Sequence, residues 1–312
     1  MKNIRELRGQ NIALKMLEAY LKGSVPPLLI FHGPDGTGKW SAAEAFVQQK
    51  LCDVGSGCGN CPSCRKFQRG EHPDFIRFPA ARVLIGEQEN AETFTIRWLI
   101  RTRLIYTPFE GDVRFVLFPA AELIQNEAET ALLKTLEEPP AHTRFIFLVR
   151  NLNDLKPTIV SRGVCIPFGL IPQKIMREMT GNADETSVEL MGGSLHYLPF
   201  FSSPLYSILK EKTQEAVKHP LALARLEQWL STGERKGFTD IDPALEYGYQ
   251  EILEIFGLLL LEAADQTPAG LEIRRTVLEF KGELNQDMQG MLPYLTGRLF
   301  QKLKEAIFKK VT

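Results

Sequence analysis

The feature that most constrains the fold is an apolar run at residues 28–32 followed by a glycine-rich loop and a helix-compatible segment. This order predicts a strand, a phosphate-binding loop and a helix, because glycines let consecutive backbone N–H groups converge on an anion at a helix N-terminus. Lys39 adds a positive charge for the β- and γ-phosphates of a nucleotide. The candidate phosphate-binding residues are Gly33, Gly36, Gly38 and Lys39, and the sequence leaves open whether ATP or ADP binds them.

The same loop lacks the groups that hold a metal ion during nucleotide hydrolysis. The residue after the lysine normally carries a hydroxyl that binds Mg²⁺, but here it is Trp40, and Ser41 lies one position late, rotated by about 100° around the helix. Hydrolysis also needs a carboxylate at the end of a neighbouring strand. The candidate strand at residues 113–118 is followed by Pro119, and no carboxylate occurs before Glu122. We therefore expect a loop that can hold a phosphate without assembling a metal site.

Short β-rich runs alternate with helical patterning through the first half of the chain. A helix is expected within residues 4–21, and strands beyond the first are expected near residues 75–78, 113–118, 145–149 and 164–168. This alternation predicts a mostly parallel sheet with helices on both faces, in which ligands bind at the carboxyl ends of the strands. The first part of the chain is therefore expected to be α/β.

The composition changes after Phe168. Residues 169–204 contain several glycines and prolines around short helical pieces, which suggests a small separate module. From residue 205 onward no strand pattern occurs, and amphipathic stretches predict a helical bundle at residues 207–229, 244–265, 271–287 and 294–310. The fold class is thus α/β followed by all-α, with predicted domains at residues 1–168, 169–204 and 205–312.

Four of the five cysteines, Cys52, Cys58, Cys61 and Cys64, follow the spacing C-x5-C-x2-C-x2-C. Four thiolates at this spacing can close a tetrahedral Zn²⁺ site in the glycine-rich segment at about residues 50–70, which has no other means of ordering itself. Four sulfur ligands leave no position for water, so the zinc is expected to be structural. An iron–sulfur cluster is the alternative, since the last three cysteines resemble part of a ferredoxin pattern. Cys165 lies in an apolar strand and is expected to be a core residue.

Charge and hydropathy exclude several classes of protein. The 37 basic and 38 acidic residues give a formal net charge of −1, so the chain as a whole is not an electrostatic nucleic-acid binder. The first eight residues are charged where a signal peptide needs an apolar core, and no apolar run of about 18 residues exists. A cytoplasmic location without membrane insertion is therefore expected.

Further motifs make the sequence resemble a known family. Residues 131–140 read ALLKTLEEPP, residues 158–162 read TIVSR, and the chain also carries Gly9-Gln10 near its start and His72-Pro73-Asp74 after the cysteines. Together with the glycine loop and the cysteine insertion, these motifs resemble the bacterial clamp-loader family over about the first 168 residues. The resemblance implies an AAA+ phosphate-loop module with a zinc-binding insertion, a small helical lid and a C-terminal helical collar domain. Asn126 and Glu129 are expected to form a capping box at the start of the motif-bearing helix.

The resemblance also implies roles for individual residues. The family's phosphate loop falls on Gly33 to Lys39, its zinc ligands fall on the four clustered cysteines, and its arginine finger falls on Arg162. An arginine finger stabilises charge on the nucleotide of a neighbouring subunit. The departures from the family pattern are Trp40 for the hydroxyl, Pro119 and Ala120 for the acidic pair, Val149 for the polar first sensor, His196 for the second-sensor arginine and Gly163 for the cysteine after the finger.

Together with these departures, the resemblance implies a non-hydrolysing, stator-type subunit of the DNA polymerase III clamp loader, which would help to load the sliding clamp onto primed DNA and supply Arg162 in trans. The implied partners are the gamma/tau and delta subunits, the sliding clamp and, through the complex, primed DNA. One alternative is a gamma/tau-like ATPase that uses unconventional residues such as Ser41 and Glu122. Another, a stand-alone zinc-dependent DNA-binding protein, is disfavoured by the nearly neutral net charge.

Overall fold

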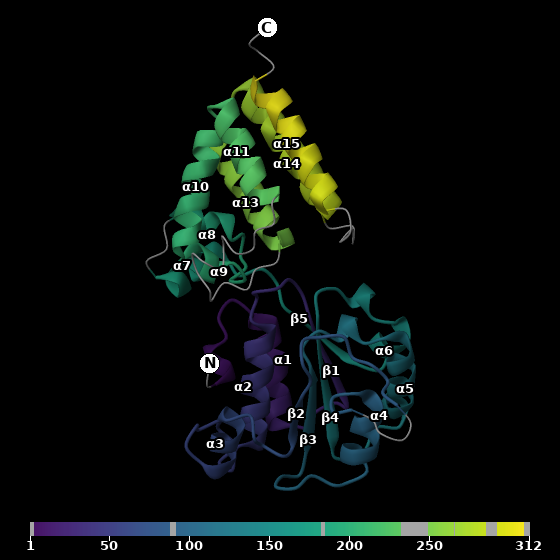
Figure 1. Ribbon diagram of the computed structural model, residues 1–312. Coiled ribbons are helices and arrows are strands. Elements are labelled where there is room, and N and C mark those ends of the chain that lie inside the picture. The colour runs from purple at the N-terminus through teal and green to yellow at the C-terminus, as the bar shows by residue number, and fades with distance from the viewer. Residues whose placement is uncertain are drawn as a thin grey trace. The chain divides into compact units, whose positions relative to one another are not determined.

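The computed structural model describes residues 3–87, 92–181, 185–231, 249–264, 266–284 and 292–308. The chain divides into two compact units, one made of Met1–Gly181 with Met191–His196 and the other of Asn182–Leu190 with Tyr197–Thr312. Figure 1 shows that the first unit contains the sheet and that the second is helical. The predicted fold class, α/β followed by all-α, is confirmed. The finer division at residues 168 and 204 stays a prediction.

The sheet of the first unit has five strands, all parallel to their neighbours, in the order β2-β3-β4-β1-β5. They are β1 (Leu28–His32), β2 (Phe75–Arg77), β3 (Arg114–Phe118), β4 (Thr143–Val149) and β5 (Val164–Pro167). Each lies where the sequence predicts a strand. The apolar runs are nearly continuous because both faces of the sheet are buried under helices.

Helices cover both faces of this sheet (Figure 1). On one face lie α1 (Asn11–Lys22), α2 (Lys39–Leu51) and α3 (Pro62–Gln68), and on the other lie α4 (Ile96–Trp98), α5 (Asn126–Glu137) and α6 (Pro157–Val160). Phe46 of α2 packs edge-on against Phe115, with ring centroids 6.1 Å apart. On the opposite face Phe118 meets Phe147 at 5.1 Å. Alternate side chains of each strand thus point to opposite faces of the sheet and belong to two separate hydrophobic cores.

Short segments and one further helix complete the first unit. They are η1 (Ile4–Glu6), the π-helical η2 (Leu99–Leu104), η3 (Ala121–Leu123), η4 (Leu152–Asp154) and α7 (Gln173–Thr180). The connection from η2 to β3 is held by a buried ion pair, Asp74 and Arg114, whose charged atoms lie 3.9 Å apart. The Asp74 carboxylate accepts N–H bonds from residues 109–111, and Arg114 donates to the carbonyls of Arg103, Tyr106 and Thr107.

The second unit is built from helices in the part of the chain that the structure describes. They are α8 (Glu185–Leu190), α9 (Leu198–Phe201), α10 (Pro204–Ala216), α11 (Pro220–Ser231), α13 (Tyr249–Ala263), α14 (Pro268–Leu284) and α15 (Leu292–Phe308). Phe256 of α13 stacks on Phe300 of α15 at 5.4 Å. The predicted stretch at residues 207–229 is two helices, because Pro220 can start a helix but cannot continue one. Residues 244–248 of another predicted stretch lie outside the described residues.

The predicted capping box of α5 is wrong. The helix begins at Asn126 itself, with Gln125 in the N-cap position and no side-chain cap. The Glu129 carboxylate instead accepts a bond from the Lys156 backbone N–H at 3.3 Å and pairs with its Nζ at 2.7 Å. This ion pair links α5 to the N-terminus of α6. The charged Lys156 side chain therefore takes the Glu129 carboxylate that the capping box would have directed to a backbone N–H of α5.

Candidate phosphate-binding loop and metal centre

The glycine loop joins the carboxyl end of β1 to the N-terminus of α2. Gly33 has φ +137°, and a Cβ there would lie 1.9 Å from the Phe168 carbonyl oxygen beyond β5. Gly36 has φ +67°, and a Cβ there would lie 2.1 Å from the His196 backbone nitrogen. Both positions therefore need glycine for backbone conformation and for close approach of another segment. The predicted strand, loop and helix are confirmed as structural elements.

The Lys39 side chain folds back onto its own loop. Its ammonium donates to the carbonyl of Gly33 and to that of Pro34 at 2.8 Å, and lies 3.5 Å from Asp35 Oδ1. Burial lowers the pKa of Lys39, and the Asp35 carboxylate opposes that shift. Asp35 also pairs with Arg150, which directly follows β4. The positive charge of Lys39 is thus compensated by Asp35 and by carbonyls of the same loop.

A second segment, residues 193–196, lies against the outside of the loop. The Ser194 hydroxyl donates to the Asp35 carbonyl at 2.7 Å, and the Leu195 N–H donates to the Gly36 carbonyl at 2.9 Å. The His196 N–H turns back to the Ser194 hydroxyl at 3.1 Å. The resemblance places His196 where the family has a sensor arginine. In the structure, the backbone of His196 lies against the loop at Gly36.

A cavity of about 480 Å³ opens at the loop within the first unit. Backbone and side chains of residues 35–41 form one wall, and apolar side chains form others: Leu7, Pro119, Leu148, Ile171, Met179 and Leu195. A polar anion-binding loop beside apolar walls fits a ligand that has a phosphate group and a flat apolar group. The shape is therefore compatible with a nucleotide.

The position where a metal-binding hydroxyl would stand is filled by an aromatic side chain. The Trp40 ring lies under the Arg77 guanidinium, 5.1 Å from ring centroid to Cζ, and Arg77 pairs with Glu44 at 2.7 Å. A cation over an indole face is attracted by the ring quadrupole. Trp40 is thus fixed to the β2 end of the sheet.

The ends of two neighbouring strands, β3 and β4, supply few polar groups to the loop. Pro119 and Ala120 follow β3, and the Val149 side chain at the end of β4 is buried. Glu122 is half-buried, its Oε2 has no hydrogen-bond partner among the described residues, and burial raises the pKa of its carboxyl. Ser41 lines the same cavity as the loop. The two residues of the alternative ATPase reading thus both lie near the loop.

Arg162 lies at the opposite edge of the sheet from the loop. It lies two residues before β5, whose Val164 pairs with Leu29 near the amino end of β1, whereas the loop follows the carboxyl end of β1. Five strand residues separate the two edges, a distance of about 16 Å. The Arg162 guanidinium donates to the Thr158 carbonyl at 2.7 Å and pairs with Glu137 at 2.8 Å. Its side chain is 33% exposed, so it remains accessible to another molecule.

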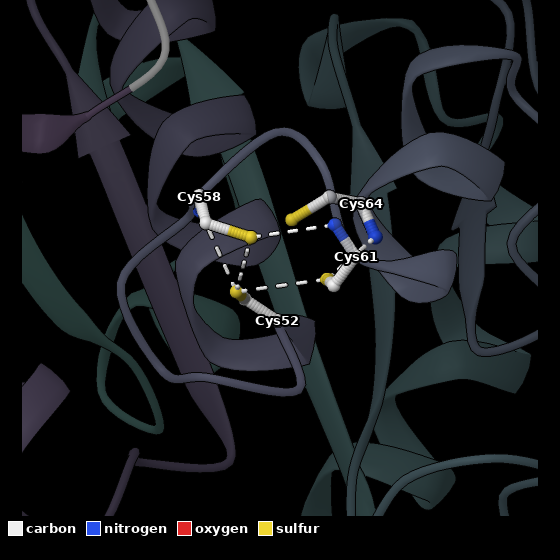
Figure 2. A group of neighbouring side chains, drawn as sticks. All are labelled: Cys52, Cys58, Cys61 and Cys64. Atoms are coloured by element: carbon white, nitrogen blue, oxygen red, sulfur yellow. Dashed lines mark hydrogen bonds between the residues drawn. The ribbon is translucent and has the colours of Figure 1, made fainter.

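The four clustered cysteines come together between the end of α2 and the start of α3 (Figure 2). Their sulfur atoms all lie within 4.8 Å of one another, and Cys52 Sγ is 3.7 Å from Cys58 Sγ and 3.8 Å from Cys61 Sγ. Four sulfurs bound tetrahedrally at about 2.3 Å would be separated by about 3.8 Å. The cluster could therefore bind a metal ion, and these spacings fit a tetrahedral one.

The thiols of the cluster differ in their surroundings. Burial raises the pKa of Cys52, but backbone N–H groups of Cys58, Val54 and Ser56 outweigh it and lower the value to about 6. Burial raises the pKa of Cys64 to about 12. Cys165, the remaining cysteine, is partly buried in β5 and packs at the second core. It lies in a different part of the sheet from the cluster.

The fold and site define the class of protein. A parallel sheet ordered β2-β3-β4-β1-β5 with a glycine loop after β1, followed by a helical part, is an AAA+ clamp-loader-like fold. Residues 9–171 match the family model described as DNA polymerase III, delta subunit. The chain belongs to this family.

Relatives support the same grouping. The chain is 30% identical to DNA polymerase III subunit tau of Salmonella typhimurium over 52% of its own length and 24% of that protein. It is 31% identical to subunit tau of Bacillus subtilis over 61% of its length and 33% of that protein. The chain thus spans a quarter to a third of these relatives. Among solved structures, a DNA polymerase III gamma subunit-related protein of Thermotoga maritima shares the fold, with TM-score 0.51 and 16% identity over 94% of this chain and 99% of that one.

Several residues at the loop were not found by sequence reasoning. Arg150 and Asp35 carry no motif, and the bonds from residues 194 and 195 join segments about 159 positions apart. Only the glycine at position 36 hints that another segment approaches closely, since a Cβ there would meet the His196 backbone. Among the described residues, no helix is long and apolar enough to span a bilayer.

Replacing Gly36 tests the contact between the loop and residues 194–196. Gly36→Ala should destabilise the protein by about 1–3 kcal/mol more than Gly70→Ala, because both glycines have positive φ but only a Cβ at Gly36 meets backbone. The measurement is urea unfolding of the two variants and the parent. Equal losses of stability would show that residues 194–196 do not constrain the loop.

Proposed function

We propose that this chain is a non-hydrolysing subunit of the bacterial DNA polymerase III clamp loader, of the delta-prime type. It acts as a rigid member of a ring that opens the sliding clamp, and its partners are the gamma/tau and delta subunits, the clamp and, through the complex, primed DNA in the cytoplasm. Residues 169–204 form the helical lid and residues 205–312 the collar through which subunits associate. The family assignment supports the complex, and the site supports the role within it.

The observation that carries the proposal is the separation of Arg162 from the glycine loop. Arg162 stands at the amino edge of β5 and the loop at the carboxyl edge of β1, so the arginine cannot serve its own loop. It can stabilise phosphate charge on a neighbouring subunit, a role that requires no nucleotide on its own chain. The Glu137 carboxylate orients it until that neighbour binds.

The loop itself supports a role without hydrolysis. The Trp40 ring stacks under the Arg77 guanidinium, and the Pro119 side chain has no atom that could bind a metal ion. The Lys39 ammonium donates its hydrogen bonds to carbonyls of its own loop. A working phosphoryl-transfer site requires a metal ion held between a hydroxyl and a carboxylate. Gly33, Gly36, Gly38 and Lys39 are therefore an inherited cradle that can bind ATP or ADP without turning it over.

The second candidate function is a gamma/tau-like ATPase. The half-buried Glu122 carboxyl near Lys39 and the Ser41 hydroxyl in the cavity wall are the observations that favour it. Glu122 would have to position water or a metal ion, and Ser41 would have to replace the absent hydroxyl. Burial raises the pKa of Glu122, which disfavours the anionic form that a metal ion needs.

The Arg162→Ala variant tests the arginine finger. In the reconstituted complex, turnover at the ATP site that Arg162 faces should fall on the order of 10³-fold, because the transition-state charge loses its partner. Assembly measured by gel filtration should not change, since the side chain is partly exposed. Arg69→Ala, at an exposed arginine of the cysteine segment, is the matched control and should retain full DNA-stimulated ATPase. Unchanged turnover in Arg162→Ala would contradict the proposal.

The purified chain should show no ATP turnover in a steady-state assay with Mg²⁺ and primed DNA, because the loop lacks metal ligands. Equilibrium binding of ATP and ADP with and without Mg²⁺ gives the complementary measurement, and any binding should be independent of the metal. Turnover that Lys39→Ala abolishes would support the gamma/tau-like alternative instead.

Zinc in the four-cysteine site is the third component of the proposal. We expect one zinc ion per chain by elemental analysis and weaker retention of zinc in Cys64→Ser, because three sulfurs leave one coordination position to water. The role is structural, since all four ligands come from protein. If elemental analysis finds iron and the purified protein absorbs visible light, the site holds an iron–sulfur cluster and the zinc proposal is wrong.

A further inference from the structure

A buried hydrogen-bonded chain runs beside the four cysteines. Ser63 lies in α3 between Cys61 and Cys64, and it is 5% exposed. Its hydroxyl donates to the Leu51 carbonyl at the end of α2, and its oxygen lies 3.0 Å from Nε2 of His72. His72 is 4% exposed. Two buried polar side chains therefore link the segment before the first cysteine to the helix that carries the last one.

The direction of this chain follows from its donors. The Asp74 backbone N–H donates to His72 Nδ1 at 3.1 Å, so Nδ1 carries no proton. The neutral imidazole then holds its proton on Nε2 and donates it to Ser63 Oγ, whose own hydrogen goes to the Leu51 carbonyl. Burial lowers the pKa of His72, which agrees with a neutral ring. Each group therefore has one assigned role.

The chain spans the part of the cysteine segment that lacks regular structure. Leu51 directly precedes Cys52, and residues 53–61 form neither helix nor strand. Besides the apolar core that Leu51 shares with Phe67 of α3, the Ser63 bond to the Leu51 carbonyl ties the residue before Cys52 to α3. His72 lies outside the segment, at the turn before β2, and fixes the orientation of that hydroxyl.

We infer that His72 is a positioning residue of the four-cysteine metal site. It acts through Ser63, and so holds Cys52 against Cys61 and Cys64 at the spacing that a tetrahedral ion requires. The inference rests on the proposed metal site and adds a residue that contributes no ligand atom. Groups of this kind, one shell beyond the ligands, typically change metal retention by 10- to 100-fold.

Two substitutions of His72 separate its two bonds. His72→Asn keeps an acceptor near the position of Nδ1 but loses the donor to Ser63, whereas His72→Gln keeps a donor near the position of Nε2. Ser63→Ala removes the same link from the other side and leaves the imidazole bonded to Asp74. Ser56→Ala is the matched control, since Ser56 is an exposed serine in the same segment.

The experiment measures transfer of Zn²⁺ from the full chain to a chromogenic chelator and the visible spectrum of the Co²⁺-loaded chain. His72→Asn and Ser63→Ala should release zinc about 10- to 100-fold faster than the parent and alter the Co²⁺ bands. His72→Gln and Ser56→Ala should stay within about threefold of the parent. The double variant His72→Asn with Ser63→Ala should release zinc no faster than either single variant, because both break one link.

Each outcome bears on the inference. If His72→Asn and Ser63→Ala release zinc at the parent's rate and give the parent's Co²⁺ spectrum, the inference is overturned. The proposed metal site would then still stand. A parent chain that takes up neither Zn²⁺ nor Co²⁺ would overturn the metal site, and the inference with it. If His72→Asn does not fold, Ser63→Ala carries the test alone, because it keeps the buried imidazole and its bond to Asp74.

Discussion

The parallel hydrogen bonding of β1 with both β4 and β5 is the constraint on which the site depends. Parallel strands place all their carboxyl ends at one edge, so the glycine loop, Pro119 and the residues after Val149 meet there. The same polarity sends Arg162 to the other edge. This fold therefore places the glycine loop at one edge of the sheet and Arg162 at the other.

The charged groups at the loop edge pair with one another without any ligand. Asp35 is shared between Lys39 and Arg150, and loop carbonyls accept hydrogen bonds from the Lys39 ammonium. A phosphate that enters the loop must displace the Asp35 carboxylate from Lys39, because burying two negative charges side by side would be unfavourable. Residues 194 and 195 add bonds to the outer carbonyls, which stiffens the closed arrangement. The loop is stable in its own right, as a structural element should be.

Much of this could be predicted from the sequence because it depends on local spacing. The strands followed from apolar runs, the loop from glycines and Lys39, and the four-cysteine cluster from cysteine spacing. The capping box of α5 failed because Lys156, nearly thirty residues away, competes for Glu129. Likewise, the pairing of Asp35 with Arg150 and the bond from Ser194 to the Asp35 carbonyl are set by tertiary packing, which no short window of the sequence contains. Long-range polar contacts were what the sequence could not supply.

The stack of Trp40 under Arg77 has a consequence for how this chain can change. A single substitution of Trp40 to threonine would return the hydroxyl but remove the ring that supports Arg77 and leave a gap between α2 and β2. The acidic pair at positions 119 and 120 would still be missing, so the intermediate would lose stability before regaining any chemistry. The packing of Trp40 against Arg77 therefore opposes a single substitution that would introduce a hydroxyl at this position.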